Sequence, residues 1–388
     1  MPLTNGTYFK PSVFTLTGIP GLESVQHWIG IPFFISFVLA IIGNGLLIII
    51  VRTERALHEP MFIFLAVLAT TDLGLTLCIT PKMLAIFWLQ SREIYFDSCL
   101  TQMYFTHTFQ CMESGMLLAM AFDRYVAICE PLRHSAILTK KALVSIVMVV
   151  TLRASVVITM CPLLVKLRLE HFRTTVITHS YCEHMAVVKL AADNVRANKV
   201  YGLFVAFSVL GFDVIFIFLS YAFIFQAVFK LPQKEARFKA FNTCTAHIFV
   251  FLQFYILTFF TSFIHRFGFN VAPYVHILLS NLYLLLPPLL NPIVYGVKTK
   301  QIREGVLKIW FFEDSRRWVS GVQAIAGCSN AGGVVPPSLV TLRTLRSSGV
   351  MAQRLQTQPS SGVVMINGSP SALQRVVVRN GFGDKLRC

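Results

Sequence analysis

The chain has 388 residues, of which 55% are hydrophobic and 13% are charged, and its mean hydropathy is +0.65. Ordinary soluble domains are far more polar, so this composition excludes a chain that lies mostly in water. The formal net charge is +16. We interpret that charge as membrane orientation plus a basic tail, and not as a nucleic-acid-binding surface.

Seven separate stretches are each long enough and apolar enough to cross a bilayer. A helix rises about 1.5 Å per residue and the hydrocarbon core is about 30 Å thick, so about 20 residues suffice. The spans are expected at Trp28–Val51, Pro60–Leu89, Ser98–Ile128, Leu143–Val165, Val200–Phe229, Ala240–Ile264 and Val271–Val297. The pattern predicts an all-α membrane protein, a seven-transmembrane helix bundle.

This pattern divides the chain into four parts. Residues 1–27 are expected to form an extracellular N-terminus, 28–297 the seven-transmembrane domain, and 298–311 a short amphipathic helix at the membrane surface. Residues 312–388 are rich in Ser, Gly, Val and Arg without a sustained period, which predicts a disordered, basic cytoplasmic tail. Such a tail can lie against anionic lipid of the inner leaflet. An extension without a role of its own explains the tail equally well.

Fixed positive charge predicts the orientation. One alternate set of connections carries most of the Lys and Arg of the short loops: Arg52, Arg55, Arg133, Lys140, Lys141, Lys230, Lys234, Arg237, Lys239, Lys298, Lys300, Arg303 and Lys308. The long connection Lys166–Lys199 is also basic, but short loops dominate the positive-inside rule, so the first set is expected to be cytoplasmic. The N-terminus is then outside, where Asn5-Gly6-Thr7 is a glycosylation sequon. No cleavable signal peptide is apparent, so the first helix is the expected targeting signal.

Most of the nine cysteines lie within the predicted spans. Cys99 begins the third span on the outer side, and Cys182 lies in the long outer connection. Both face an oxidising compartment, so they either form a disulfide or remain two free thiols.

Several motifs together carry a family resemblance. Met120-Ala121-Phe122-Asp123-Arg124-Tyr125-Val126-Ala127-Ile128-Cys129 ends the third span, Lys239-Ala240-Phe241-Asn242-Thr243-Cys244 opens the sixth, and Pro287-Pro288-Leu289-Leu290-Asn291-Pro292-Ile293-Val294-Tyr295 closes the seventh. With Gly43-Asn44, Leu57-His58-Glu59-Pro60-Met61 and Ser220-Tyr221, they resemble an odorant receptor of the rhodopsin-like G-protein-coupled class. Gly18-Ile19-Pro20-Gly21-Leu22-Glu23 and His265-Arg266-Phe267-Gly268 resemble its class I, or fish-like, branch.

The resemblance implies a Cys99–Cys182 disulfide, and it also exposes two departures. Class I receptors usually carry a further cysteine pair in the second outer loop, where this chain has Phe172 and Ala192. We therefore expect the loop to be held mainly by Cys99–Cys182 and to be looser than in relatives. Family members also usually stop soon after the short helix, whereas this chain continues to Cys388.

For signalling, the resemblance implies that Asp123 holds Arg124 in the inactive state and that outward movement of the sixth helix frees Arg124 to meet a G protein. Tyr221 and Tyr295 are expected to close in behind it. The coupling and activation residues expected on this basis are Asp123, Arg124, Tyr125, Tyr221, Arg237, Lys239, Asn291, Pro292 and Tyr295.

Two acids lie deep in the bundle without a sequence-local partner, Asp72 and Glu113. The resemblance places Asn44 and Asn291 beside them. Two carboxylates in a low-dielectric site need a shared proton, a cation or water, so a sodium or proton site is expected. Arg153 and Asp213 are also intramembrane charges. Their partners cannot be assigned from the sequence, and a structural role is favoured for both.

The ligand is expected to enter from outside, among the third, fifth and sixth spans. Polar groups in lipid turn inward, so a polar stripe on the third span and another on the sixth are expected to face one cavity, with an apolar wall from the fifth span. The third span supplies His107, Gln110, Cys111 and Ser114, the sixth Tyr255, Thr258, Ser262 and Arg266, and the fifth Phe204, Val205 and Val209. Arg266 is expected to bind a carboxylate bidentately, which suggests an aliphatic acid as ligand. Met185, where some acid-sensing relatives have glutamine, suggests a less polar head group or a larger ligand.

The resemblance further implies coupling to a stimulatory olfactory-type G protein that raises cAMP. Alternatives are a non-olfactory receptor for small metabolites and a transporter, although the sequence has no internal repeat and no matched broken helices. An amine receptor is disfavoured because Thr106 and His107 stand where an Asp would be needed. No nucleophile–base grouping, metal spacing or phosphate loop suggests an enzyme.

Overall fold

The computed structural model describes residues 10–230, 232–267, 272–308, 343–346, 349–352 and 376–377. Inside these ranges only the backbone is described at 239, 243, 262–267, 273 and from 343 onward. The chain divides into two compact units, Met1–Ile309 and Trp310–Cys388, which are described separately.

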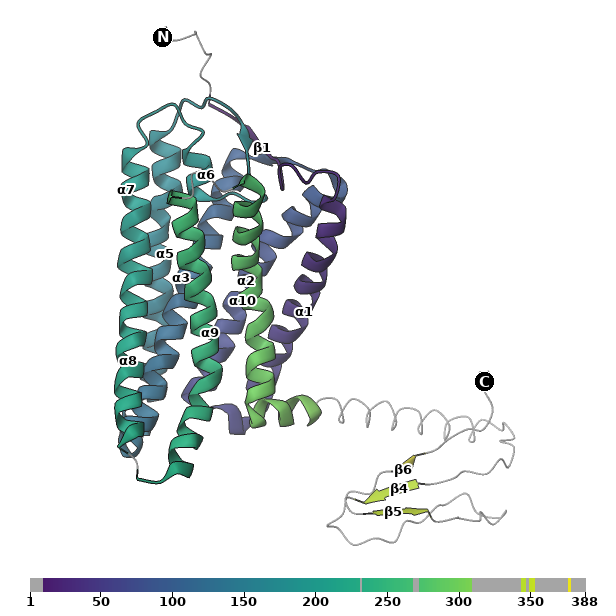
Figure 1. Ribbon diagram of the computed structural model, residues 1–388, viewed down its shortest axis with the longest axis vertical. Coiled ribbons are helices and arrows are strands. Elements are labelled where there is room, and N and C mark those ends of the chain that lie inside the picture. Colours follow the sequence, from purple (N-terminus) through teal and green to yellow (C-terminus); the bar gives the residue numbers. More distant parts are fainter. Residues whose placement is uncertain are drawn as a thin grey trace, which may run out of the picture. The chain divides into compact units, whose positions relative to one another are not determined.

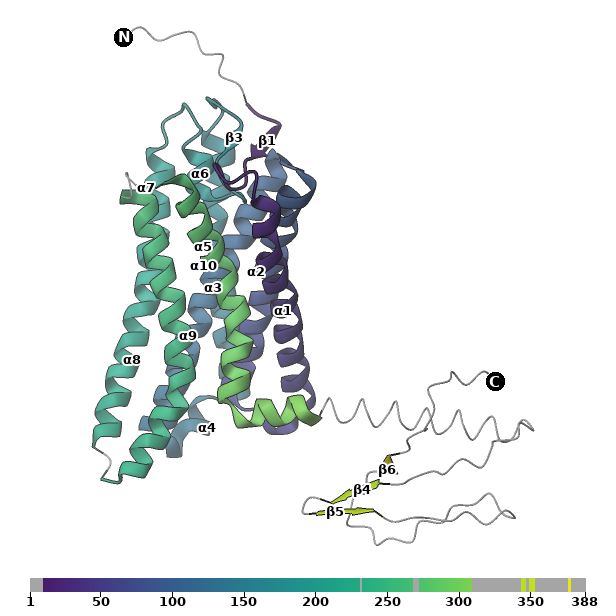
Figure 2. The same ribbon diagram turned by 45° about the vertical axis from the view of Figure 1, so that its right-hand side comes forward.

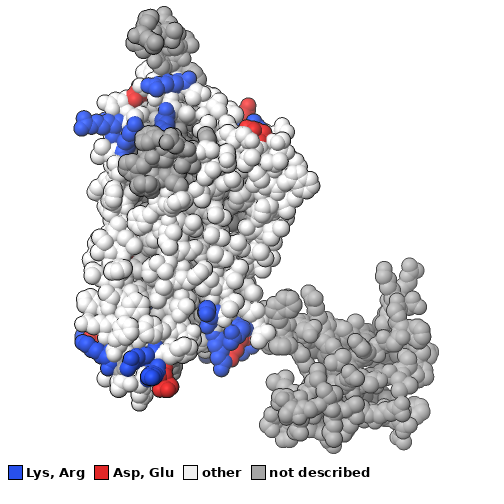
Figure 3. Space-filling model, viewed as in Figure 1, with Lys and Arg blue, Asp and Glu red and all other residues white. Residues whose placement is uncertain are grey.

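The first unit is a bundle of long, roughly parallel and antiparallel helices (Figures 1 and 2). The membrane-length helices are α1 (Gln26–Thr53), α2 (Pro60–Leu89), α3 (Phe96–Cys129), α5 (Lys140–Arg168), the continuous run α7 (Arg196–Val205), η3 (Ala206–Gly211) and α8 (Phe212–Phe229), α9 (Lys234–Phe267) and α10 (Pro273–Lys298). These correspond in order to the seven predicted spans. In the space-filling view, Lys and Arg gather at both ends and leave an uncharged band between them (Figure 3). That distribution suits a molecule whose middle lies in hydrocarbon.

Among the described residues, six of these helices have both the length and the hydrophobicity of a membrane span, whereas α3 is long enough but less apolar. The helix α3 carries Glu113, Asp123 and Arg124 and packs against α2, α5, α8 and α9. A helix surrounded by other helices can carry polar side chains because they meet protein and not lipid.

Local sequence signals explain several helix ends. Pro60 occupies the first turn of α2, where its missing N–H costs nothing, and α2 ends at Gln90, whose φ of 53° is the left-handed C-cap conformation. Thr139 caps α5 by accepting a hydrogen bond from the Ala142 N–H at 3.3 Å. The fifth span is interrupted by η3, which is π-helical. Such π segments inside α-helices are found most often at functional sites.

A small sheet covers one end of the bundle, and the sequence did not predict it. Strand β1 (Val13–Leu16) pairs antiparallel with β2 (Glu93–Tyr95) and parallel with β3 (Val176–Ile177). Phe14 on β1 is fully buried against the rings of Phe96 and Phe172, with ring centroids 5.6 Å away in both cases. We call this end of the bundle the disulfide end.

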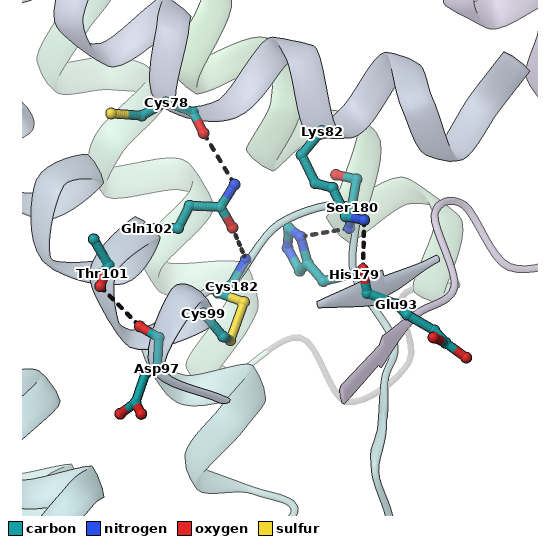
Figure 4. Close-up of a disulfide and its surroundings, with 10 residues drawn as sticks. All are labelled: Cys78, Lys82, Glu93, Asp97, Cys99, Thr101, Gln102, His179, Ser180 and Cys182. Atoms are coloured by element: carbon teal, nitrogen blue, oxygen red, sulfur yellow. Dashed lines mark hydrogen bonds between the residues drawn. A yellow bond between two sulfur atoms is a disulfide. The ribbon is translucent and has the colours of Figure 1, made fainter. Parts of the chain in front are cut away.

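The disulfide Cys99–Cys182 ties the start of α3 to the loop between α5 and α7 (Figure 4). Gln102 supports it from both sides: its amide Nε2 donates to the Cys78 carbonyl at 3.0 Å, and its Oε1 accepts from the Cys182 N–H at 2.9 Å. The sequence-based pairing is therefore confirmed, and the bond closes the loop down onto α2 and α3.

The expected disulfide is joined by further contacts that hold the loop. Phe172 forms an antiparallel β-bridge with Ala191, and the Ala192 N–H donates to the His171 carbonyl at 2.7 Å. Asp193 accepts from the backbone N–H groups of Glu170 and His171, both at 2.7 Å. Thus the positions at which class I receptors usually have the second cysteine pair are held by backbone pairing and by aromatic packing of Phe172.

The other end of the bundle carries short elements: η1 (Arg55–Leu57), η2 (Pro131–Arg133) and α4 (His134–Ile137). After α10, residues 300–308 are helical and turn away from the bundle (Figure 1), which agrees with the short helix expected from residue 298. Ile302 in this segment is buried, and Lys308 Nζ forms an ion pair with Glu54 at 2.8 Å.

In the second unit the described residues are three strands. β4 (Arg343–Arg346) pairs antiparallel with both β5 (Gly349–Ala352) and β6 (Val376–Val377). At these residues the structure differs from the expected disordered tail. The rest of the predicted tail, like Asn5, lies outside the described residues.

Candidate functional site: a cavity, two buried charge clusters and an ion pair opposite the disulfide

A cavity of about 160 Å³ lies toward the disulfide end, lined by α3, α5, α7, η3, α9, α10 and the loop that Cys182 anchors. Its wall includes one polar stripe of α3, where His107 Nδ1 donates to Gln110 Oε1 at 3.0 Å. The lining residues are His107, Gln110, Cys111, Ile158, Cys161, Tyr181, Glu183, His184, Met185, Gly202, Val205, Ala206, Leu210, Thr258, Thr261, Ser280 and Tyr283.

Five of the predicted ligand residues line this cavity: His107, Gln110, Cys111, Val205 and Thr258. For Ser262 and Arg266 only the backbone is described.

Four predicted ligand residues lie elsewhere. Phe204 is 56% exposed on the outside of the bundle, and Val209 is buried against Cys111 and Ile158 without reaching the cavity. Ser114 and Tyr255 lie in a separate polar cluster, described next.

That cluster joins four helices through one buried ion pair. Arg153 on α5 donates two hydrogen bonds to Asp213 on α8, both at 2.6 Å. Ser114 on α3 donates to the same carboxylate at 2.7 Å and contacts the Tyr255 hydroxyl of α9 at 2.8 Å. A fork-to-fork arrangement of this kind is the strongest geometry for an ion pair.

Arg153 and Asp213, which the sequence left without partners, are therefore each other's partner. The Asp213 side chain is 0% exposed and that of Arg153 is 26% exposed. Asp213 is the second residue of α8 and follows directly on the π-helix η3, whose Ala206 and Leu210 line the cavity. The cluster thus lies one helical turn from Cys111 on α3 and directly after the cavity wall on the fifth span.

A second buried cluster contains the two acids Asp72 and Glu113. The Asn291 amide donates to Asp72 Oδ2 at 2.9 Å, and Glu113 interacts electrostatically with Asp72 and Asn291. Asn44, 1% exposed, donates its amide to the Ala40 and Pro288 carbonyls at 3.0 and 2.8 Å. The structure thus brings Asp72, Glu113 and Asn291 together, as the sequence suggested.

This cluster differs from the first because its oxygens outnumber its donors. Four buried oxygen atoms have no hydrogen-bond partner among the described residues: Asn44 Oδ1, Asp72 Oδ1, Glu113 Oε1 and Asn291 Oδ1. Buried polar atoms are rarely left unpaired. An excess of hard oxygen ligands fits a sodium ion, a proton shared by the acids, or water.

At the end opposite the disulfide, Asp123 is shared by two side chains, Arg124 and His134. Arg124 Nε donates to Asp123 Oδ2 at 3.0 Å, and His134 Nε2 donates to Oδ1 at 3.0 Å. The Asp123 side chain is 0% exposed and that of Arg124 is 14% exposed. The expected Asp123–Arg124 pair is present, and His134 of α4 is a second partner that the sequence did not indicate.

Two tyrosines stand near this pair as expected. Tyr221 on α8 contacts His247 Nδ1 of α9 at 2.6 Å, and Tyr295 of α10 is fully buried. His247 was not predicted, because a buried histidine in an apolar helix gives no distinct signal. Tyr125 packs against Phe223, with ring centroids 6.1 Å apart.

The remaining expected coupling residues are less informative. The ring of Pro292 lies so close to Gly43 that a Cβ on Gly43 would come within 2.8 Å of it, which explains the glycine. Arg237 lies in the first turn of α9, where its backbone N–H donates to the Gln233 carbonyl at 3.2 Å. For Lys239 only the backbone is described.

Comparison with known proteins agrees with this geometry. The olfactory receptor family model matches residues 33–313. Olfactory receptor 52A5 of Homo sapiens is 63% identical over 313 residues, which cover 81% of this chain and 99% of that protein. Olfactory receptor 51E2 of Mus musculus is 51% identical over 302 residues, covering 78% of this chain and 94% of that protein. Squid rhodopsin shares the fold, with a TM-score of 0.60 at 18% identity, over 75% of this chain and 86% of that structure.

A rhodopsin-like, multi-pass receptor bundle is therefore the class that fold and site define. The chain belongs to the olfactory receptor family. It is a plasma-membrane receptor and not an enzyme, and its partners are an odorant and a G protein.

Proposed function

We propose that the chain takes a small aliphatic ligand, with a carboxylic acid as the favoured head group, into the cavity from the extracellular side. Binding there activates a stimulatory, olfactory-type G protein and raises cAMP. The observation that carries this proposal is the cavity at the disulfide end, opposite the Asp123–Arg124 pair. Ligand and G protein thus occupy opposite ends of α3.

The cavity limits the ligand's size. An apolar cavity of roughly 150 Å³ holds a molecule as large as benzene, and this one measures about 160 Å³. A ligand of about six to ten heavy atoms is therefore expected. Binding pockets combine an apolar wall with a few polar groups that fix orientation, and here His107, Gln110 and Thr258 supply such groups beside Val205 and Leu210.

The backbone path of α9 supports the proposed head-group residues Ser262 and Arg266. Thr258 and Thr261 line it, and α9 continues as a helix through Phe267. On a helix, Ser262 follows Thr258 by one turn and Arg266 by a second turn on the same face. This backbone position supports Arg266 as the anchor for a carboxylate.

Matched ligands test the anchor. In cells that report cAMP, Arg266→Ala should weaken the response to straight-chain acids of four to eight carbons by about tenfold to a hundredfold. A charge-assisted hydrogen bond contributes about 1.5–3 kcal/mol, and each 1.4 kcal/mol is tenfold. The corresponding alcohols should lose much less, and Arg266→Lys should retain part of the acid response. Unchanged acid responses in Arg266→Ala would contradict an arginine anchor.

Activation is proposed to separate α9 from α8 at the end opposite the disulfide. The Tyr221–His247 hydrogen bond joins α8 and α9 at that end, and the Asp123–Arg124 pair, which lies within α3, keeps Arg124 bound to its own helix. Both lie where an outward movement of α9 would open a surface for a G protein. Arg124→Ala should abolish ligand-dependent nucleotide exchange while ligand binding in the cavity persists. Exchange at the wild-type rate would exclude this role for Arg124.

A sodium ion or a shared proton is proposed at the four unpaired oxygens of Asn44, Asp72, Glu113 and Asn291. The bound cation would stabilise the inactive packing because it neutralises two facing carboxylates. In the test, sodium is titrated against choline while basal and ligand-driven cAMP are measured. Glu113→Gln should remove the sodium effect, and a sodium response identical to that of the wild type would contradict the site.

The proposed orientation places the disulfide end and Asn5 outside and the residues that follow α10 inside. Enzymatic removal of N-glycans should shift the mobility of the wild type and not of Asn5→Gln. An N-terminal epitope tag should be stained on intact cells, and a C-terminal tag only after permeabilisation. Staining of both tags on intact cells would refute this orientation.

A further inference from the structure

A group of five cations at the disulfide end has no function in the receptor described so far. Each of these side chains is exposed, and none has an ion-pair or hydrogen-bond partner among the described residues. We call them the basic patch: Arg168, Arg173, Lys189, Arg196 and Lys199. None of them lines the cavity.

Backbone contacts bring the parts of the basic patch together. The Arg173 N–H donates to the Leu190 carbonyl at 2.9 Å, which puts Arg173 beside the segment that carries Lys189. Asp193 binds the backbone of Glu170 at 2.7 Å, so the end of α5 with Arg168 meets the chain just before Arg196. Arg196 and Lys199 stand three residues apart on α7 and so share a face. In the space-filling view Lys and Arg gather over this end (Figure 3).

The acids of the same segment do not neutralise the patch. Residues 166–199 contain six Lys or Arg and three Asp or Glu. Asp193 is committed to His171, whose side-chain Nδ1 lies 2.9 Å from it, and Glu183 caps α6 (His184–Val188) by accepting from the Ala186 N–H at 2.6 Å. Only Glu170 remains, while Lys166, the sixth cation, is already paired with Asp97 at 2.8 Å.

Folding does not account for two of these cations. Arg196 and Lys199 lie in the first turn of α7, where the helix dipole disfavours positive charge. Arg173 and Lys189 lie in the loop beyond the end of α5 and not on a membrane-length helix. An outer connection this basic also runs against the positive-inside pattern of the short loops.

We propose that the basic patch is a docking surface for an acidic polysaccharide, a chain bearing repeated sulfate or carboxylate groups. Several unpaired cations spread over neighbouring segments match an extended polyanion better than one small carboxylate. Such contacts work through charge complementarity and are strongly weakened by salt. The proposal rests on the orientation given above, and not on the identity of the odorant.

The test measures binding of a fluorescent heparin octasaccharide to intact cells that have been treated to remove their own acidic glycans. Binding is normalised to the staining of an N-terminal tag, which independently reports orientation and surface expression. Replacing all five patch residues with Gln should weaken binding at least tenfold. Raising monovalent salt from 50 to 200 mM should weaken wild-type binding by a similar factor.

Matched controls separate charge from folding. The replacement of Arg168, Arg173 and Arg196 with Lys should preserve binding, and Lys140→Gln, a single charge removed at the opposite end of the bundle, should change nothing. If the variant with all five Gln substitutions fails to reach the surface, two double variants replace it. Each should reduce binding severalfold: Arg173→Gln with Lys189→Gln, and Arg196→Gln with Lys199→Gln. Equal binding by wild type and variants, equal binding of neutral dextran, or capture of anionic lipid vesicles without the octasaccharide would overturn the proposal.

Discussion

Two buried charge clusters of the bundle contrast with each other. In one, Arg153 and Asp213 neutralise one another through two hydrogen bonds of 2.6 Å, and Ser114 donates a third hydrogen bond to the Asp213 carboxylate. In the other, Asp72 and Glu113 face each other without a cation of the chain, and four oxygens lack partners among the described residues. A matched pair holds helices in place, whereas an unmatched pair depends on something from solution. The first is therefore suited to structure and the second to regulation.

The largest effect is expected from a substitution that breaks the Arg153–Asp213 pair. Arg153→Met should destabilise the receptor by about 3–5 kcal/mol, because it leaves the Asp213 carboxylate, 0% exposed, without its cation. Asp213→Asn should cost less, since the Arg153 side chain is 26% exposed and can reach toward the interface. Thermal unfolding of purified receptor in lipid nanodiscs measures both. Replacing both residues with Leu should recover much of the loss, and equal damage from the double and single variants would argue against a matched pair.

The unmatched pair should respond in the opposite direction. Glu113→Gln removes one of two neighbouring carboxylates, so stability in sodium-free buffer should stay within about 1 kcal/mol of the wild type or rise. The gain in thermal stability that sodium gives the wild type should disappear in this variant. A large loss of stability in Glu113→Gln would show that Glu113 is a structural partner after all, which would remove the contrast.

A smaller effect is expected from Tyr255→Phe, which tests whether the Arg153–Asp213 cluster transmits ligand binding from the cavity. Tyr255→Phe removes the hydroxyl that contacts Ser114 at 2.8 Å, and one hydrogen bond contributes about 1 kcal/mol. Tyr201→Phe is the matched control, because it loses the bond from its hydroxyl to the Val157 carbonyl at 2.7 Å. Both should lower stability similarly, and only Tyr255→Phe should change the maximal cAMP response. Equal signalling changes in the two variants would mean that the cluster does not transmit.

The smallest expected effect concerns Asp193, which lies in the loop between α5 and α7, outside both clusters. The backbone N–H of His171, with its side chain and the Glu170 N–H, holds the pKa of Asp193 below its ordinary value. A depressed carboxyl pKa stabilises the folded loop above the ordinary value near 3.9, and this contribution is lost as the pH falls through the depressed value. Hydrogen-exchange protection of residues 170–193, corrected for the intrinsic exchange rate at each pH, should therefore fall at acidic pH in the wild type. Asp193→Asn should be fast already at neutral pH, and an identical pH profile in both would contradict this.

The sequence predicted the number and order of the helices, because runs of apolar residues and helix-ending signals are local. The span Pro60–Leu89 was predicted with the bounds that α2 has. Helix faces were predicted less well. The expected wall of Phe204, Val205 and Val209 is shifted by one residue from the observed wall of Val205, Ala206 and Leu210. Each residue turns an α-helix by about 100°, so an error of one residue moves a side chain from the cavity to the lipid.

Contacts between distant helices were beyond the sequence. Arg153 and Asp213 are 60 residues apart, and no local pattern shows that their helices face each other there. The sheet of β1, β2 and β3 joins three segments from widely separated regions, each too short to give a strand signal. The family motifs did locate Asp123, Arg124 and Cys182, whereas His134 and His247 became apparent only from their geometry.

Gln102 has a consequence for how this receptor matures. Its amide joins the Cys78 carbonyl and the Cys182 N–H without depending on the sulfur–sulfur bond. These two hydrogen bonds hold the backbone of Cys182 over the start of α3, where Cys99 lies. A Gln102→Leu receptor is therefore expected to form this disulfide less efficiently and to accumulate in the endoplasmic reticulum with mispaired sulfhydryls.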